Sequence, residues 1–359
     1  RSQPVKQPIT TPTRLPMTLG LDLGDRSTSS CLVGDQGIVE EGSVRTEALT
    51  LRAACERAQA RGAERVVMEV GTHSPWVSRE IASLGLEVVV ADPHAVKLIW
   101  AAGRKSDRRD AQVLARLGRA DIELLRPIQH RGAQAQADLS LLRSRAQLVE
   151  VRTGLVNHVR GACKSLGVRL PKCSTESFHK AVASSIPAEL KTAQDALLSS
   201  IAHLTAKIKE LDREIDRMCA ELYPETKHLR QVAGVGPITA LTFVLTIEHP
   251  DRIKHTRNVG AYFGLVPDCS QSGSRDPELH ITKRGDEDVR RLLVSCAQYI
   301  LGPFGPDTDL QRFGRRLELK GGKAAKRRAV VAVARKLAVL LLSLWRSGQT
   351  YVLLKNSSA

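Results

Sequence analysis

The chain has 359 residues, well beyond the usual length of a single domain, so we expect two or three folded units and not one small domain. Hydrophobic residues make up 42% of the sequence and charged residues 26%, which excludes a chain that is disordered throughout. The 54 lysines and arginines outnumber the 38 aspartates and glutamates, for a formal charge of +16. This excess favours a polyanionic partner, with nucleic acid as the leading candidate.

Several protein classes are disfavoured by what the sequence lacks. No run of 18 uninterrupted apolar residues occurs, and prolines recur through residues 1–16, so we expect a disordered leader there and a soluble, cytoplasmic, nucleoid-associated protein with no membrane partner. The seven cysteines form no CxxC pair, which fits neither a disulfide framework nor a zinc knuckle. Aromatic residues make up only 3%, which disfavours a base-stacking platform.

The segment over residues 17–125 has the pattern of a mixed α/β domain. Apolar runs separated by turn residues predict strands at 17–23, 29–33 and 38–46. Alternating helices and strands follow, with helices at 50–62, 76–84 and 106–119 and strands at 65–70 and 86–91. Three strands followed by this alternation indicate a sheet of the ribonuclease-H-like order.

A helical region is predicted over residues 133–223. In its first helix apolar pairs recur every seven residues, at Leu141/Leu142, Leu148/Val149 and Leu155/Val156. In its second helix apolar residues recur in steps of four and three, which is typical of a coiled-coil seam: Leu197, Ile201, Leu204, Ile208, Leu211, Ile215, Met218 and Leu222. The two helices pair within one chain, or the seam joins subunits; the sequence leaves both open.

A compact helical domain is predicted over residues 224–351. Near its start, Gly234 and Gly236 lie in a turn that opens a helix, the pattern of a helix-hairpin-helix, where backbone N–H groups approach a phosphate. A helix that only needs a tight entry turn would show the same residues. Near its end, a stretch with a single acid, Glu318, carries ten basic residues that predict a phosphate-facing surface: Arg312, Arg315, Arg316, Lys320, Lys323, Lys326, Arg327, Arg328, Arg335 and Lys336.

Four acids are candidates for a metal site. Asp22 ends the first predicted strand, Glu69 ends the fourth, and Asp107 and Asp110 are three residues apart on a predicted helix, where such positions share a face. Carboxylate oxygens are ligands that Mg²⁺ prefers, and two such ions can clamp an in-line phosphoryl transfer. Taken singly, each acid has an ordinary explanation as a turn cap, a solvated residue or a weak ion-pair partner.

A second candidate site begins at Gly264. Ser270, Ser272 and Ser274 surround Gly273 there, and Lys283 and Arg284 follow, so a hydroxyl precedes cations that could stabilise a pentavalent phosphorus. Serines and glycines are also ordinary loop residues, so composition alone does not assign a nucleophile.

Together these segments identify a family resemblance. LGLDLGDRSTS, VMEVGTHSPW, KSDRRDA, QVAGVGPITA and FGLVPDCSQSG, followed by ITKRGD, resemble the DEDD-type insertion-sequence transposases, which are bridge-RNA-guided serine recombinases. The resemblance covers residues 17–351 and implies a RuvC-like first domain whose acids are Asp22, Glu69, Asp107 and Asp110.

The resemblance further implies a mechanism and partners. Ser272, immediately before Gly273, falls on the family's nucleophile, so a phosphoserine link to DNA would form while Mg²⁺ on the four acids positions the scissile phosphate. It also implies a structured guide RNA that pairs with donor and target DNA, and a homo-oligomer, a dimer or tetramer, in which Ser272 could come from a neighbouring subunit.

Three other functions stay open on the sequence. A RuvC-type junction nuclease would use the same acids with activated water, leaving Ser272 as a loop residue. LDLGDRSTS also resembles the phosphate loop of actin-like and sugar-kinase ATPases, but a coiled coil and a basic tail stand where their second phosphate loop would be needed. A nucleic-acid-binding scaffold without chemistry is the remaining possibility.

Overall fold

The computed structural model describes residues 15–99, 106–269, 279–322 and 324–355. The chain forms two compact units that divide after Ala133, and each is described by itself. Of the leader predicted over residues 1–16, residues 1–14 lie outside the described part.

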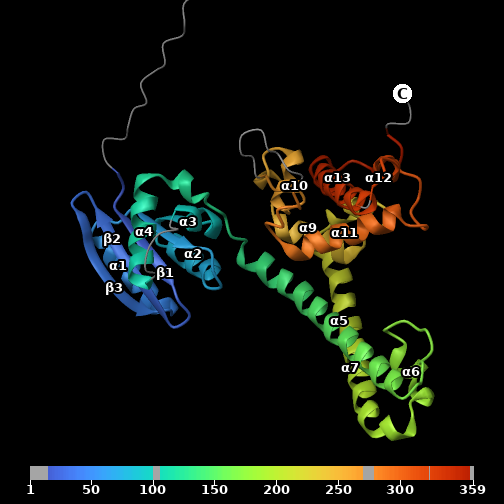
Figure 1. Cartoon of the computed structure of the whole chain (residues 1–359). Helices are drawn as coiled ribbons and strands as arrows, with labels where there is room; N and C mark the ends of the chain where they lie inside the picture. The colour runs from blue at the N-terminus through green and yellow to red at the C-terminus, as the bar shows by residue number, and fades with distance from the viewer. Residues whose placement is uncertain (1–14, 100–105, 270–278, 323, 356–359) are drawn as a thin grey trace, which may run out of the picture. The chain divides into compact units, whose positions relative to one another are not determined.

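The first unit is built on one five-stranded mixed sheet (Figure 1). Its strands lie in the order β3-β2-β1-β4-β5, with β1 antiparallel to β2 and parallel to β4. The strands are β1 (Thr18–Leu23), β2 (Ser27–Gly34), β3 (Gly37–Arg45), β4 (Arg65–Glu69) and β5 (Glu87–Ala91). The prediction of a mixed α/β sheet is confirmed.

Helices cover both faces of this sheet. Leu21 and Met68 point to the face covered by α1 and α2, where they pack with Leu51 and Val77. On the opposite face, Val67 and Val89 pack with Leu114 of α4. The helices are α1 (Ala48–Ala60), α2 (Ser74–Ala82), α3 (Pro93–Ile99) and α4 (Asp107–Ala120), followed by a short 3₁₀ helix, η1 (Ile122–Leu125). Helix α3 was not expected from the sequence. It follows the apolar strand β5 so closely that the change from strand-like to helical spacing of apolar residues is not visible.

Two glycines bring α4 unusually close to the sheet. A Cβ atom on Gly20 of β1 would lie 2.1 Å from the carbonyl oxygen of Ala111, and one on Gly118 of α4 would lie 2.2 Å from a methyl group of Val67. These distances are far below van der Waals contact, so only glycine fits at either position. Close backbone approach is the reason for glycine inside this strand and this helix.

The second unit begins with two long helices, α5 (Ala133–Ser165) and α7 (Lys191–Glu221), which pack against each other within the chain (Figure 1). Every seventh residue of the α7 seam is buried, at Ile201, Ile208 and Ile215, whereas Leu204 and Leu211 are half-buried. The alternative hypothesis, that the seam joins subunits, stays a prediction.

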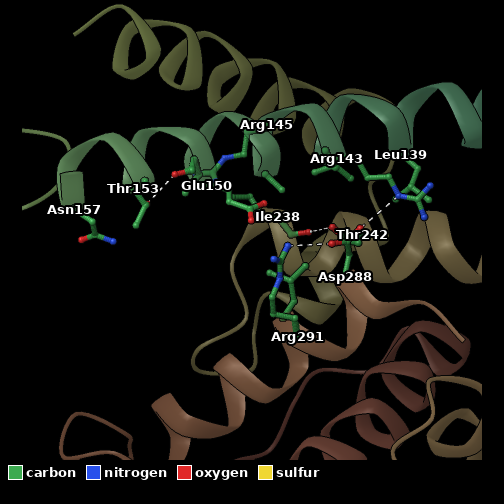
Figure 2. Close-up of a pocket in the computed structure, with 15 residues that line it drawn as sticks. Leu139, Arg143, Arg145, Glu150, Thr153, Asn157, Ile238, Thr242, Asp288 and Arg291 are labelled. Atoms are coloured by element: carbon green, nitrogen blue, oxygen red, sulfur yellow. Dashed lines mark hydrogen bonds and ion pairs between the residues drawn. The ribbon is translucent and has the colours of Figure 1, made fainter. Parts of the chain in front are cut away.

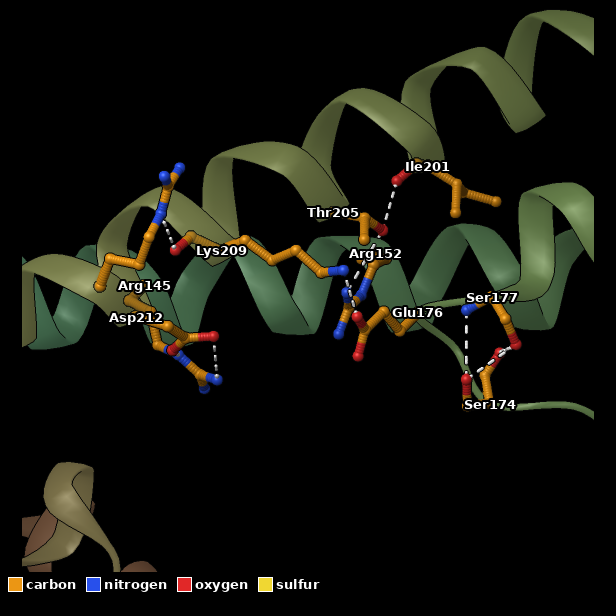
Figure 3. Close-up of polar contacts among 10 residues, drawn as sticks. Arg145, Arg152, Ser174, Glu176, Ser177, Ile201, Thr205, Lys209 and Asp212 are labelled. Carbon is orange, nitrogen blue, oxygen red and sulfur yellow. Dashed lines mark hydrogen bonds and ion pairs between the residues drawn. The ribbon is translucent and has the colours of Figure 1, made fainter. Parts of the chain in front are cut away.

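Polar contacts also hold the two helices together (Figure 3). Arg152 of α5 is only 8% exposed and donates from Nη1 to Thr205 Oγ1 of α7 at 3.3 Å. Arg145 pairs with Asp212 at 2.8 Å. The connecting loop carries the short helices α6 (Phe178–Ala181), η2 (Ala183–Ser185) and η3 (Ala188–Leu190), and is tied to α7 by an ion pair from Lys209 to Glu176.

The rest of the unit is helical. Residues 239–247 of α9 are all buried, which places this helix in the core with α11 and α13. The helices are α8 (Thr226–Leu229), α9 (Pro237–Ile247), η4 (Pro250–Arg252), η5 (Thr256–Asn258), α10 (Val259–Tyr262), α11 (Glu287–Leu301), α12 (Asp309–Leu319) and α13 (Ala325–Ser347). In the described part of the chain, no helix is long and apolar enough to cross a membrane.

We predict that Gly20→Ala destabilises the first unit by about 1–3 kcal/mol, the usual cost of overpacking, because the added methyl forces α4 away from β1. Hydrogen exchange of β1 and β4 in the full chain measures this as faster exchange. Gly71→Ala is the matched control, since a Cβ there meets nothing within 4 Å. Equal exchange in both variants would contradict the close-contact argument.

Candidate functional site

Asp22 and Glu69 lie at the same end and on the same face of the sheet. Gly20 of β1 pairs with Val67 of β4, and both contact α4. Asp22 and Glu69 are each two residues further along these parallel strands, and residues two apart point to the same face. Both residues therefore lie on the face that α4 covers, and both are half-buried.

Helix α4 runs opposite to β1. Its carboxyl end is tied to the start of β4, where Arg65 donates to the carbonyl oxygen of Gly118 at 2.6 Å, and to the β2–β3 turn, where Arg119 pairs with Asp35. The first turn of α4 is therefore directed to the end of the sheet where β1 and β4 finish. Asp107 and Asp110 lie in that turn.

An ion pair fixes this end of α4 to the sheet. Arg108 and Gln112 both hydrogen-bond to Glu41 of β3, with Arg108 Nε at 2.9 Å from Oε2. The hydrogen bond from Arg108, followed by that from Gln112, lowers the pKa of Glu41, which keeps its carboxylate ionised. The negative charges of Asp107 and Asp110 are also favourable beside the helix amino terminus.

The four acids have the right donor chemistry for a hard divalent cation. The strand register and the direction of α4 bring their backbone positions to one end of one face. Among the described residues, however, no group of three or more His, Cys, Asp or Glu side chains is close enough to hold a metal ion. Metal binding by this quartet stays a prediction.

Ser272 lies in a segment, 270–278, outside the described residues, together with Ser270, Gly273 and Ser274. The chain on either side forms two arms of a hairpin. Thr282 N donates to Val266 O at 2.9 Å and Asp268 N donates to His280 O at 2.8 Å, with a bridge between Pro267 and Ile281. The two arms thus bring both ends of the serine segment together.

Two further glycines close the base of this hairpin. A Cβ on Gly264 would lie 2.2 Å from the carbonyl oxygen of Arg284, and one on Gly285 would lie 2.0 Å from that of Tyr262. Both glycines also have positive φ, and so does Lys283. Lys283 and Arg284 are exposed at this crossing of two backbones. Sequence reasoning named Gly264 only as the start of this segment and did not single out Gly285.

Two arginines hold the hairpin base to the helices. Arg290 of α11 donates from Nη1 to the carbonyl oxygens of Phe263 and Arg284, at 3.2 and 3.3 Å, so it bridges both arms. Arg143 of α5 pairs at 2.9 Å with Asp286, which caps α11 immediately after Gly285. These residues set the position of the hairpin base relative to the long helices.

A cavity of about 510 Å³ lies beside this anchor, between α5, α9 and α11 (Figure 2). Its walls include the apolar side chains of Leu142 and Ile238. The arginines at its edge are paired, Arg291 with Asp288 at 3.0 Å and Arg143 also with Asp288 at 3.5 Å. Because these charges already have partners, the cavity is not a preformed anion site.

The glycine turn before α9 has a clear structural role. Gly234 has positive φ, and a Cβ there would lie 2.8 Å from the ring of Tyr299. Gly236 caps the amino end of α9, and a Cβ there would meet nothing within 4 Å. Gly234 is therefore required by packing, while Gly236 leaves open space at a helix amino terminus, as a phosphate contact needs. The helix-hairpin-helix interpretation stays a prediction.

The basic stretch is divided between two helices. It covers α12 and the start of α13, and Gly321 and Gly322 separate the two at positive φ. Several of its side chains are exposed, namely Arg316, Lys320, Lys326, Arg327, Arg328, Arg335 and Lys336. Arg312 pairs with Asp307, Arg315 pairs with Glu318, and Lys323 lies outside the described residues.

Comparison with known proteins identifies the family. A model described as Transposase IS116/IS110/IS902 family matches residues 226–308, and a DEDD transposase model of the IS110 group matches residues 19–166. A "Probable family 20 transposase" of Pseudomonas aeruginosa is 30% identical, over 82% of this chain and 88% of that protein. The chain belongs to the IS116/IS110/IS902 family of transposases.

This transposase is also similar to another curated transposase and, in part, to a solved structure. The transposase for insertion sequence element IS1111A of Coxiella burnetii is 26% identical, over 80% of this chain and 79% of that protein. Among solved structures, Thermus thermophilus RuvC matches at 17% identity with a TM-score of 0.24, over 28% of this chain and 90% of that one. The DEDD model covers all four acids of the transposase, and the other covers the glycine turn and the hairpin arms.

The cysteines of the transposase provide a test of the hairpin. Burial raises the pKa of Cys31 to about 11 and that of Cys55 to about 12, whereas Cys269 is exposed on the first hairpin arm. The thiolate is the reactive form, so we expect a maleimide to modify Cys269 fastest in the native protein. Mass spectrometry of peptides measures the rates. Cys269→Ser should remove the fast phase, and rapid modification of Cys31 or Cys55 would contradict the described core.

Proposed function

We propose that this transposase cuts and rejoins DNA strands with Ser272 as nucleophile and a divalent metal held by Asp22, Glu69, Asp107 and Asp110. The observation that carries the proposal is the placement of the acids. Asp22 and Glu69 end neighbouring parallel strands on the face that α4 covers, and the first turn of α4 is directed to that end.

The donor set supports magnesium as the metal. Four carboxylates are oxygen ligands, and Mg²⁺ is commonly held by a few carboxylates together with substrate phosphates. When bound, the metal would supply positive charge that orients and polarises the scissile phosphate. The ion pair of Glu41 with Arg108 then has a positioning role, because it fixes the turn that carries Asp107 and Asp110.

The hydroxyl of Ser272 would carry out the strand cleavage. Its Oγ attacks the phosphorus, the bond from phosphorus to the leaving deoxyribose oxygen breaks, and the serine proton is transferred to that oxygen through a base. Rejoining is the reverse attack by a strand hydroxyl on the phosphoserine ester. Each step exchanges one phosphate ester for another, so strands can be rejoined without a nucleotide cofactor.

The hairpin and its cations support this role. Lys283 and Arg284 lie on the arm that follows the serine segment and are exposed, so they can approach the negative charge that develops on phosphorus. Arg290 bridges the two arms, which fixes the ends of the segment. We propose that the complete site forms when this hairpin meets the acidic face, from the same subunit or from another subunit of a homo-oligomer.

A structured guide RNA is part of the proposal. An exposed surface of lysines and arginines contacts phosphates of any sequence, so it supplies affinity without choosing a site. Base pairing with a guide RNA would then choose donor and target, as in other RNA-guided systems. RNA sequencing after purification from cells that carry the flanking noncoding DNA tests this part directly.

The decisive experiment looks for a covalent protein–DNA adduct. We expect the native transposase, incubated with Mg²⁺, DNA of the element ends and any co-purified RNA, to form an adduct that survives denaturing electrophoresis. Ser272→Ala should abolish the adduct, and Asp22→Asn should abolish both adduct and cleavage. Ser274→Ala is the matched control and should retain the adduct.

The ends of the cleaved DNA strands distinguish the serine mechanism from hydrolysis by activated water. If Ser272→Ala still cleaves and leaves strands with no protein attached, activated water is the nucleophile and the protein is a metal-dependent nuclease of the RuvC type. If Asp22→Asn leaves cleavage unchanged, the acid quartet does not carry the chemistry.

We predict that replacing Arg327 and Arg328 together by alanine weakens nucleic-acid binding for all sequences and flattens its salt dependence. Two lost phosphate contacts reduce the slope of log K against log salt by about 1.8 on duplex DNA. Binding titrations over a range of salt concentrations measure this slope. The matched control replaces Lys207 and Arg213, two exposed cations of α7, with the same change in charge. An equal change in slope in both double variants would show a general charge effect.

A further inference from the structure

One phenylalanine of the second unit is exposed, whereas the other phenylalanines are packed. The ring of Phe304, between α11 and α12, is 82% exposed, whereas Phe178, Phe243 and Phe263 are fully buried. The fifth phenylalanine, Phe313, packs against the core of the same unit. In a chain so poor in aromatic residues, this exposure needs an explanation.

The loop that carries Phe304 is held firmly. Gln311 of α12 donates from Nε2 to the carbonyl oxygens of Ile300 and Gly305, at 3.1 and 3.0 Å. A Cβ on Gly305 would lie 2.1 Å from the same Ile300 oxygen, so the loop closes tightly on the end of α11. Pro303 and Pro306 fix φ on either side. The loop therefore holds the backbone of Phe304 in a defined place, so binding costs little further backbone entropy.

Charged side chains of α12 lie beside the loop, and two of its arginines form ion pairs. Arg315 donates from Nη2 to the carbonyl oxygen of Leu301 at 2.7 Å, just before the loop, and Arg312 pairs with Asp307, just after it. Arg316 is exposed on the same helix. Tyr299, itself 45% exposed, links this end of α11 to the glycine turn through its contact with Gly234.

An exposed ring beside charged side chains favours a nucleotide over an apolar protein surface as the partner of Phe304. An apolar protein surface that covered Phe304 would also bring the ion pairs of Arg312 and Arg315 out of water, which is costly for charged groups. A nucleotide avoids this cost, because its base can stack on the ring while its phosphates remain in water and approach the exposed Arg316. Every base has such a face, so the contact does not depend on sequence.

We propose that Phe304 stacks on an unpaired nucleobase of the nucleic acid bound by this transposase. The inference rests on the proposed function. Aromatic residues are too few for a base-stacking platform of several rings. One exposed ring on an ordered loop is nevertheless enough to stack on a single base. The unpaired base can come from a DNA strand opened during strand exchange or from a single-stranded part of an RNA.

The test measures binding of the full chain to short fluorescein-labelled strands of DNA and RNA, each compared with an all-abasic DNA strand of equal length. Stacking of one base changes affinity by about 5- to 150-fold. We expect Phe304→Ala to weaken binding to base-containing strands within this range and to leave binding to the abasic strand unchanged. Whichever of the DNA and RNA strands loses more affinity identifies the source of the base.

Three variants complete the design. Phe304→Trp should keep the affinity, and its fluorescence should be quenched on binding. Phe304→Leu, which keeps apolar volume without an aromatic face, should behave like Phe304→Ala. Leu319→Ala is the matched control, since Leu319 is 85% exposed on α12 and has no such face. Because Phe304 is so exposed, none of its substitutions should alter the fold.

The outcomes separate this inference from the proposed function. If the native protein binds strands and Phe304→Ala binds them equally well, the stacking contact is wrong and the proposed function stands. If Phe304→Ala instead changes the oligomeric state in light scattering, the ring packs on a second copy of the chain, which also overturns the inference. If the native protein binds neither DNA nor RNA, the proposed function itself fails.

Discussion

The close contact between α4 and β1 determines what the first unit can do. Because Gly20 has no side chain, the backbone of α4 lies directly on the strand, and the helix can pass over β1 and β4 at a short distance. Its direction then follows from the ties at its two ends, Arg65 with the carbonyl of Gly118 and Arg108 with Glu41. A larger residue in the strand would lift the helix, and the acids of its first turn would move away from those at the strand ends.

Close backbone approach at glycine also shapes the second unit. Gly264 and Gly285 let two backbone segments cross at the base of the hairpin that leads to and from the serine segment. Arg290 ties the crossing to α11, and Asp286 connects it through Arg143 to α5. The reactive segment that we propose is thus carried by a fixed base, while its own chemistry needs only a hydroxyl and nearby cations. Rigid support of this kind is what positions catalytic groups on loops.

In the proposed function, binding and chemistry occupy different parts of the second unit. The exposed cations of α12 and α13 lie after the hairpin in the chain, and Phe304 lies between the two. Phosphate contacts give affinity that depends on salt concentration, whereas stacking of a single base gives affinity that does not depend on it. The two contributions can therefore be measured separately, and neither requires the protein to read a sequence.

The sequence was sufficient to predict the mixed sheet, the two long helices and the candidate acids, because alternation, helical period and strand-end carboxylates are local patterns. It could not determine the direction of α4, because that depends on contacts such as Arg65 with Gly118, fifty-three residues apart. The sequence also predicted one basic surface, whereas two glycines divide the basic stretch between α12 and α13. Only tertiary structure decided that Gly234 packs on Tyr299, that Gly264 and Gly285 permit a backbone crossing, and that Phe304 stays in solvent while the other phenylalanines pack. The physical reason is that burial and close approach depend on what the rest of the chain brings to each residue.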